Sequence, residues 1–276
     1  MPKLNDKQIK TFNRDGYVIA RKFFSNQEID LLRKTIIQDQ EITKRSFRRK
    51  DGEGGAIRYL VWNHPGESLY GIFSRCERIV DSVESLLDDE VYHYHSKLIL
   101  KEPRFGGAWE WHQDYGYWYH FGCLFPMMAS VSITIDQATR VNGCIQILKG
   151  SHLIGRIDHI LEGDQMAADP EVILAACERL ELIFCEMNPG DVLFFHCKTI
   201  HRSDHNHSSN PRRSLICSFN AKRNNPYKNS QHPRYTPLVK VKDRLIINKG
   251  LKGFSTNEDW MNPDEAMKYR KSIFGS

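Results

Sequence analysis

A histidine and an aspartate two positions apart, His112 and Asp114, are the residues whose types and spacing most directly suggest chemistry. They belong to the stretch WHQDYGYWYHFG, residues 111–122. Residues i and i+2 of a β-strand point to the same face, so the imidazole and the carboxylate would lie side by side. With a second imidazole from a distant strand they would form the facial triad that leaves three positions open on non-haem Fe(II). The pair therefore predicts an iron site for oxygen chemistry, completed by a histidine elsewhere in the chain.

His201 is the candidate for that second imidazole. It ends the stretch DVLFFHCKTIH, whose apolar part is a predicted strand introduced by the turn sequence NPGD. Arg212 stands eleven residues later, at the head of the next predicted strand. A guanidinium near the metal would bind a carboxylate through two charge-assisted hydrogen bonds. This order of residues predicts 2-oxoglutarate as cosubstrate, with its keto-acid end on iron and its far carboxylate on the arginine.

Two other interpretations use the same part of the chain. His201, His205 and His207 in HRSDHNH could hold zinc, but no cysteine joins them and the His112–Asp114 pair would have no role. A non-catalytic barrel that keeps the metal for structure, or that binds 2-oxoglutarate without turnover, is the alternative from another functional class. The intact ligand set and the intact arginine favour an enzyme.

The elements that must position these residues begin with a mostly helical first third. A helix is predicted over residues 6–13, then a short strand in GYVIARKFF, then a second helix that begins after Ser25. Ser25 and Glu28, three residues apart, form the pattern of a capping box. Helical periodicity returns over residues 66–89.

From Val91 onward the chain changes to short alternating or apolar runs separated by glycine, asparagine and proline. One interruption, DPEVILAACERL, is predicted as a short helix or a covering loop. We expect one domain of the mainly β class, a barrel or sandwich with flanking helices. Its parts are a helical segment over residues 1–90, a β core over 91–225 and a C-terminal extension over 226–276, which packs over the barrel mouth. The predicted strands lie in residues 91–100, 127–136, 143–150, 180–187, 191–197 and 214–222.

Alternation along two of these strands predicts which side chains face the site. In MMASVSITID the apolar face should pack under the helices, and the hydroxyl-bearing face should line a polar cavity. In VYHYHSKLIL the imidazole and ammonium groups share one face, which suggests a lined interior or a wet surface. Gln113 should point outward. The apolar face is Ala129, Val131, Ile133 and Ile135, and the hydroxyl-bearing face is Met128, Ser130, Ser132 and Thr134; in VYHYHSKLIL, His93, His95, Lys97 and Ile99 lie opposite Tyr92, Tyr94, Ser96 and Leu98.

Composition limits the classes of protein to consider. Of 276 residues, 40% are hydrophobic and 26% charged, as in ordinary globular proteins, and no apolar run of 18 residues or signal-peptide pattern is present, so we expect a cytoplasmic protein. Seven scattered cysteines without a CxxC pair predict reduced thiols. The net charge of +5 is modest; the basic stretch KRSFRRK, residues 44–50, is predicted as a solvated loop or the rim of a site for an anionic substrate. Neither a nucleic acid nor a membrane partner is expected, and the oligomeric state is left open.

Longer motifs carry a family resemblance. The opening RDGYVIARKFFSNQEIDLLR, then HQD, NGCIQILKGSH, GDVLFFH and HRSDHNHSSNPRRS, resemble the phytanoyl-CoA dioxygenase family of Fe(II)- and 2-oxoglutarate-dependent oxygenases. The resemblance implies a double-stranded β-helix core, also called a jelly roll and similar to that of cupins. By position it implies His112, Asp114 and His201 as iron ligands, and Arg212 as the cosubstrate arginine with Arg213 as the alternative.

The same resemblance extends to the rest of the pocket. Ser203 matches a hydroxyl that binds 2-oxoglutarate, and Trp118 and Ser130 match cosubstrate-pocket positions in the ectoine hydroxylase branch; Lys97 and His95 lie on the strand where that branch places polar pocket groups. The implied reaction consumes 2-oxoglutarate and O₂ and releases succinate and carbon dioxide, with ascorbate as a candidate reductant. Because the iron-binding carboxylate is intact, hydroxylation is favoured over halogenation.

The substrate is predicted only as a class. Tyr115 and Tyr117 belong to an aromatic group that would either form a wall over the iron, favouring an ammonium group, or pack in the core. Nearby cations, among them Arg58 and Lys97, favour an anionic group. A small zwitterion fits both features: the first hypothesis is an aminophosphonate such as 2-aminoethylphosphonate, and the alternatives are an amino acid, an ectoine-like osmolyte or an acyl-CoA.

Overall fold

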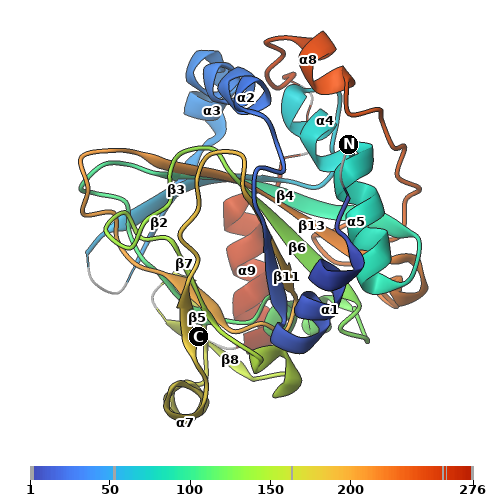
Figure 1. Ribbon diagram of the computed structural model, residues 1–276. Coiled ribbons are helices and arrows are strands. Elements are labelled where there is room, and N and C mark those ends of the chain that lie inside the picture. Colours follow the sequence, from blue (N-terminus) through green and yellow to red (C-terminus); the bar gives the residue numbers. More distant parts are fainter. Residues whose placement is uncertain (1–2, 52–53, 163, 257, 259, 275–276) are drawn as a thin grey trace.

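Two antiparallel β-sheets face each other across the middle of the molecule (Figure 1). The computed structural model describes residues 3–51, 54–162, 164–256, 258 and 260–274. Among these residues, the larger sheet has the strand order β1-β11-β6-β13-β4-β3-β2, the smaller sheet has the order β10-β7-β12-β5, and β8 pairs with β9. The larger sheet contains β1 (Tyr17–Ala20), β2 (Phe47–Lys50), β3 (Ala56–Trp62), β4 (Val91–Lys101), β6 (Met128–Thr134), β11 (Val192–His196) and β13 (Arg212–Ala221). The smaller sheet contains β5 (Trp109–His112), β7 (Ile145–Leu148), β10 (Leu182–Phe184) and β12 (His201–Ser203), and the separate pair is β8 (His159–Glu162) with β9 (Gln165–Ala168).

Helices cover the outer face of the larger sheet. The second helix begins where the sequence predicts, because the Ser25 hydroxyl accepts from the amide of Glu28 (3.3 Å) and the Glu28 carboxylate accepts from the amide of Ser25 (2.8 Å). No helix among the described residues is both long and apolar enough to cross a membrane. The helices are α1 (Asp6–Asp15), α2 (Asn26–Gln38), α3 (Gln40–Arg45), α4 (Leu69–Arg75), α5 (Glu77–Leu87), α6 (Asp114–Trp118), α7 (Pro170–Arg179), α8 (Leu245–Lys249) and α9 (Pro263–Phe274), with 3₁₀ turns η1 (Tyr119–Phe121), η2 (Ser151–Leu153) and η3 (Lys222–Asn224).

The apolar face of β6 packs under these helices, as its alternation predicts. Val131 and Ile133 are fully buried in one cluster with Phe73 of α4 and Val80 of α5. Ser130, on the opposite face, turns toward the space between the two sheets, where it bonds to a carboxylate described below. The core between helices and sheet therefore holds the wall from which the site is built.

The prediction that side chains alternate strictly along β4 is wrong for the first part of the strand. The register between β13 and β4 shifts between Ser218 and Phe219, which face His95 and His93 and leave Tyr94 as an extra residue. The rings of Tyr94 and His95, although consecutive, both lie 5.5 Å from the ring of Trp118. A β-bulge of this kind inserts one residue and re-aims its neighbours, which period-2 counting does not foresee.

Much of the polar stretch over residues 40–66 has regular secondary structure. It forms α3, β2 and β3, and the basic residues 47–50 are an edge strand that pairs with β3 from Phe47↔Tyr59 to Lys50↔Ala56. The expectation of a solvated loop is therefore wrong. Strand alternation is present in FRRK, but a buried arginine replaces the apolar residue that would reveal it.

The C-terminal segment divides between two faces of the molecule. Ile246 of α8 packs in the cluster under the helical layer, whereas Tyr269 of α9 packs with Phe121 beside the site. Figure 1 shows these two helices at separate places, α8 beside α4 and α9 behind the sheets. Both halves of the segment contribute to the region beside the site, since His232 lines a cavity there together with Met261 and Ala266.

Candidate active site

Adjacent strands of the smaller sheet bring His112 and His201 together. The two residues are paired in the β12–β5 ladder, and their ring centroids lie 4.1 Å apart. The Nδ1 of His112 lies 2.7 Å from the carbonyl of Glu110, and the Nδ1 of His201 lies 2.9 Å from the carbonyl of Thr199. Since a carbonyl only accepts, each Nδ1 carries its proton and leaves Nε2 as a lone pair for a metal.

Asp114 reaches the same point from a helix rather than a strand. β5 ends at His112, and Asp114 is the first residue of α6. One carboxylate oxygen accepts a hydrogen bond from the hydroxyl of Tyr117 (2.6 Å), and the other accepts from the hydroxyl of Ser130 (3.1 Å). Strand parity alone therefore does not explain why the pair shares one face: the turn into α6 and two hydroxyl donors aim the carboxylate.

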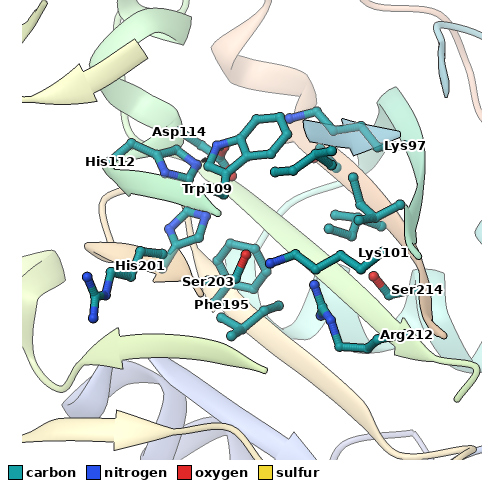
Figure 2. Close-up of a pocket in the computed structure, with 16 residues that line it drawn as sticks. Lys97, Lys101, Trp109, His112, Asp114, Phe195, His201, Ser203, Arg212 and Ser214 are labelled. Atoms are coloured by element: carbon teal, nitrogen blue, oxygen red, sulfur yellow. Dashed lines mark ion pairs between the residues drawn. The ribbon is translucent and has the colours of Figure 1, made fainter. Parts of the chain in front are cut away.

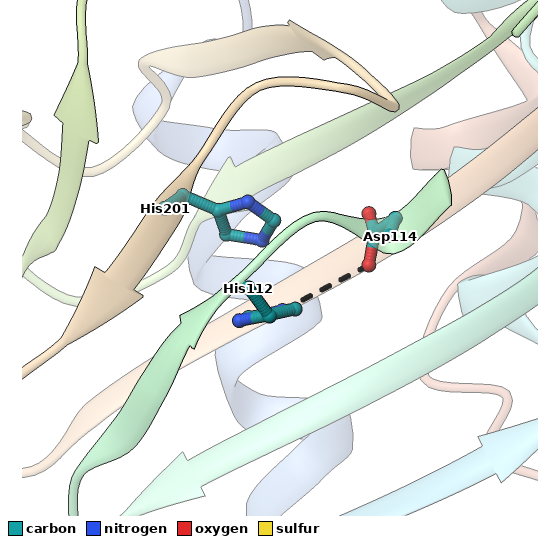
Figure 3. Close-up of side chains that lie close together, drawn as sticks. All are labelled: His112, Asp114 and His201. Carbon is teal, nitrogen blue, oxygen red and sulfur yellow. Dashed lines mark ion pairs between the residues drawn. The ribbon is translucent and has the colours of Figure 1, made fainter. Parts of the chain in front are cut away.

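The three side chains converge on one point (Figure 3). Their candidate ligand atoms all lie within 4.8 Å of one another, and within the described part of the chain theirs is the one such group of three or more histidine, cysteine or carboxylate side chains. Burial lowers the pKa of His112 well below its usual value, with the neighbouring His201 adding to the effect, and burial also lowers the pKa of His201. Two neutral imidazoles and a carboxylate are donors that a divalent iron ion accepts, so the residues present fit the metal. His205, a ligand of the alternative zinc site considered above, pairs instead with Asp51 (2.8 Å).

Gln113 is buried, which contradicts the outward orientation predicted for it. Its amide nitrogen donates to the carbonyls of Gly155 (2.8 Å) and Lys198 (2.7 Å), and its amide oxygen accepts from the amide of Ile157 (2.9 Å). The chain leaves the sheet immediately after His112, so the next side chain points between two loops and not into solvent. Gln113 therefore fixes the junction between the two ligand-bearing elements.

A cavity between the sheets connects the three side chains to Arg212 (Figure 2). The triad lies at one end, and Arg212, at the start of β13, lies at the other with Ser214 beside it. Arg212 is 4% exposed, and burial lowers its pKa to about 10. Its Nε has no hydrogen-bond partner among the described residues. A buried guanidinium without an acid partner is a receptor for an anion.

Lys101 is a cavity residue that sequence reasoning missed. It lines the cavity beside Arg212, is 1% exposed and donates to the backbone carbonyl of Asp204. Burial, followed by the charge of Arg212, holds the pKa of its amine well below the usual value. Strand periodicity could have identified Lys101, since it follows Lys97 by four positions and therefore lies on the same face of the strand.

Several residues predicted for the pocket line one of two adjoining cavities. Ser203 and Lys97 line the cavity that holds the triad and Arg212. A second cavity adjoins the first at Lys97 and Trp109 and is also lined by His95, Tyr117 and Trp118. Trp118 thus belongs to the second cavity, not the first, and Ser130 supports Asp114 and does not line either.

Other candidates lie outside both cavities. Arg213 forms an ion pair with Asp136 (2.6 Å), so it is no substitute for Arg212. Arg58 donates to the hydroxyl of Ser46 (2.8 Å) and pairs with Glu102 (3.4 Å). The hydroxyl of Tyr115 donates to the carbonyl of Leu124 (2.6 Å) and the ring packs in the core, the second of the two roles considered for it.

Comparison with known proteins gives consistent matches. The family described as Phytanoyl-CoA dioxygenase (PhyH) matches residues 12–214. An ectoine dioxygenase from Bordetella bronchiseptica is 25% identical over 248 residues, covering 84% of this chain and 80% of that protein. An L-proline trans-4-hydroxylase from Streptomyces griseoviridis is 26% identical over 254 residues, covering 86% and 92%. The crystal structure of EctD from S. alaskensis with bound Fe has a TM-score of 0.73 at 22% identity, covering 87% of this chain and 88% of that one, which confirms the jelly-roll core.

Proposed function

Since the chain belongs to the phytanoyl-CoA dioxygenase family, we propose that it hydroxylates a small zwitterionic metabolite. It is a non-haem dioxygenase that uses Fe(II) and 2-oxoglutarate. One observation carries the proposal: the convergent His112, Asp114 and His201 share one cavity with Arg212, which has no carboxylate partner among the described residues. That cavity has the metal donors at one end and an anion receptor at the other, as a chelating dicarboxylate requires.

In this proposal His112, Asp114 and His201 hold the iron. When bound, the iron supplies oxygen activation coupled to decarboxylation of 2-oxoglutarate to succinate. The carbonyls of Glu110 and Thr199 fix the imidazole tautomers, and Tyr117 and Ser130 hold the carboxylate through its two oxygens.

Arg212 and Lys101 would bind the far carboxylate of 2-oxoglutarate together. Both are buried in the same cavity, and neither has a carboxylate partner among the described residues. A carboxylate placed between them would stabilise the charged form of both groups. Ser203, on the wall between the triad and the two cations, offers a hydroxyl to the same molecule.

The second cavity is the proposed substrate site. Trp109 lines both cavities, and its ring lies 6.0 Å from that of His112, so a molecule in the second cavity lies beside the metal ligands. Rings of Tyr59, Trp109, Tyr117 and Trp118 surround it, and Arg49 and Lys97 bring positive charge. Aromatic faces favour an ammonium group and the cations an anionic one, so the lining suits a zwitterion.

Among zwitterions we favour an amino acid or an ectoine-like osmolyte. Two relatives similar over most of the chain are named for ectoine and L-proline, both small zwitterions with a carboxylate. 2-Aminoethylphosphonate is the second candidate, because two cations in one cavity suit a group that carries more than one negative charge. An acyl-CoA is disfavoured, since three cations of the basic stretch that would bind its phosphates already have carboxylate partners. Glu41 pairs with Lys44 (2.8 Å) and Arg45 (3.5 Å), and Glu102 pairs with Arg48 (3.0 Å).

Anaerobic reconstitution tests the proposal. Protein loaded with Fe(II) and 2-oxoglutarate should show a visible charge-transfer band. On exposure to air it should release succinate faster with L-proline, ectoine or 2-aminoethylphosphonate than with no addition or with an acyl-CoA. The His112→Ala variant should lose both the band and the turnover. Undiminished turnover in that variant, or wild-type protein that binds no Fe(II), would refute the proposal.

A further inference from the structure

Strand β2 turns one arginine of the basic stretch into the protein. Along β2, Arg48 and Lys50 are exposed, whereas Arg49 is 6% exposed and pairs with Ile57 across the ladder. Successive strand residues alternate between faces, so the stretch presents its cations to two different environments. Of the cations of this stretch that the structure describes, Arg49 is the one that lines the second cavity, next to Phe47 on the same face of β2.

The surroundings of Arg49 are aromatic, not acidic. Its Cζ lies 5.3 Å from the ring centroid of Tyr59 and 5.8 Å from that of Trp109. Its side chain has no hydrogen bond and no ion pair among the described residues, whereas the side chain of its neighbour Arg48 pairs with Glu102 at 3.0 Å. Rings at this distance orient a guanidinium through its faces and leave its five N–H donors available.

We propose that Arg49 is the specificity residue that binds the anionic group of the substrate, a carboxylate or a phosphonate. The inference rests on the proposed function and adds to it the residue that selects for a negative charge. A guanidinium matches both groups through paired N–H donors. A buried guanidinium without an acidic partner carries an uncompensated charge, which is unfavourable. Binding of an anion compensates that charge, whereas binding of a neutral ligand does not.

The position of Arg49 separates this role from cosubstrate binding. Arg49 lines the second cavity and not the first, whereas Arg212 and Lys101 line the first and not the second. Trp109 stands between, 5.8 Å from Arg49 and 6.0 Å from the His112 ring. An anion held by Arg49 therefore anchors one end of a small molecule while its carbon skeleton extends along Trp109 toward the metal ligands.

Isothermal titration under anaerobic conditions tests the proposal without a known substrate. Protein saturated with Fe(II) and 2-oxoglutarate, so that Arg212 is occupied, is titrated with acetate, methylphosphonate and ethylammonium. Arg49→Met should weaken binding of the preferred anion roughly tenfold or more, and Arg49→Lys should retain part of it. Arg48→Met, which removes a cation from the opposite face of the same strand, should bind as the wild type does.

The outcomes distinguish failure of the proposed role of Arg49 from failure of the proposed function. Comparing acetate with methylphosphonate shows which anion the site takes. Equal anion affinity in wild type and Arg49→Met, or no binding of either anion to wild type, overturns the role of Arg49. The visible band with Fe(II) and 2-oxoglutarate should be unchanged in Arg49→Met, which shows that the variant is folded. Absence of the band from wild type would refute the proposed function instead.

Discussion

Lys101 provides a test of the cosubstrate end of the cavity at the scale of a single residue. Lys101→Met removes one of the two cations proposed to bind the far carboxylate of 2-oxoglutarate. We expect the KM for 2-oxoglutarate to rise about tenfold, a typical effect of losing one charge-assisted hydrogen bond. Lys101→Arg should restore part of the affinity if charge is what matters. The measurement is succinate release as a function of 2-oxoglutarate concentration.

Arg213→Met is the matched control, because Arg213 pairs with Asp136 outside the cavity. Its KM for 2-oxoglutarate should stay near the wild-type value. If Lys101→Met binds 2-oxoglutarate as tightly as the wild type does, Lys101 only supports the backbone through the carbonyl of Asp204.

Tyr117 tests how the carboxylate ligand is aimed. Its hydroxyl donates to Asp114 at 2.6 Å, so Tyr117→Phe removes one of the two hydroxyl donors on that carboxylate. Groups that orient a ligand in this way typically contribute 10–100-fold to metal affinity, and we expect Fe(II) affinity to fall by about that range. Tyr115→Phe is the control, because that hydroxyl bonds to the carbonyl of Leu124. Identical Fe(II) titrations for the two variants would contradict the role of Tyr117.

At the scale of elements, the junction between β5 and α6 positions two proposed metal ligands, His112 and Asp114. Gln113 connects it to two loops through three side-chain hydrogen bonds, with Gly155, Lys198 and Ile157. Gln113→Ala leaves these buried groups without partners, and we expect a loss of roughly 2–4 kcal/mol in the free energy of unfolding. Urea unfolding monitored by fluorescence measures it. Substitutions at exposed positions usually change the free energy of unfolding by no more than ~0.5 kcal/mol. A change that small in Gln113→Ala would show that Gln113 does not fix the junction.

The elements also show which parts of the molecule the sequence could predict. Ser25 with Glu28 and the apolar face of β6 were predicted correctly, because each depends on local spacing that the fold preserves. The bulge at Tyr94 and the burial of Gln113 were not, because each depends on a partner strand or loop far along the chain. The burial of Arg49 was not predicted for the basic stretch, since a cation at an inward position breaks the apolar alternation that reveals a strand.

The site follows the same division. The convergence of His112, Asp114 and His201 was predicted from motif order together with the family resemblance. Lys101 was not predicted as a site residue, because a lysine on a strand is usually exposed. Its burial depends on the opposing sheet. The sequence thus identified the residues proposed to bind iron and cosubstrate better than those that line the proposed substrate cavity. The latter come from β2, β3, β4, β5, α6, β9 and the C-terminal segment.

At the scale of the whole molecule, burial of neutral histidines makes stability depend on pH. Burial lowers the pKa of His93 to about 4, of His159 to about 4 and of His196 to about 3. In the unfolded chain each imidazole has an ordinary pKa near 6.5. Between these values the unfolded state binds more protons than the folded state, so stability falls as the pH drops from about 6.5 toward 4 and is fully present above that range.

His93 is the group on which to test this dependence, because it is not among the proposed metal ligands. Its ring nitrogens contact the carbonyl of Asn63 (2.9 Å) and the hydroxyl of Ser96 (2.7 Å). His93→Gln keeps a polar side chain but removes the titration, so the variant should lose less stability between pH 7 and 5 than the wild type does, by about 1–2 kcal/mol. Urea unfolding of the metal-free protein at both pH values gives the two differences. Equal losses in the two proteins would mean that His93 is not held neutral by the fold, since removing a group with the ordinary pKa leaves the pH dependence of folding unchanged.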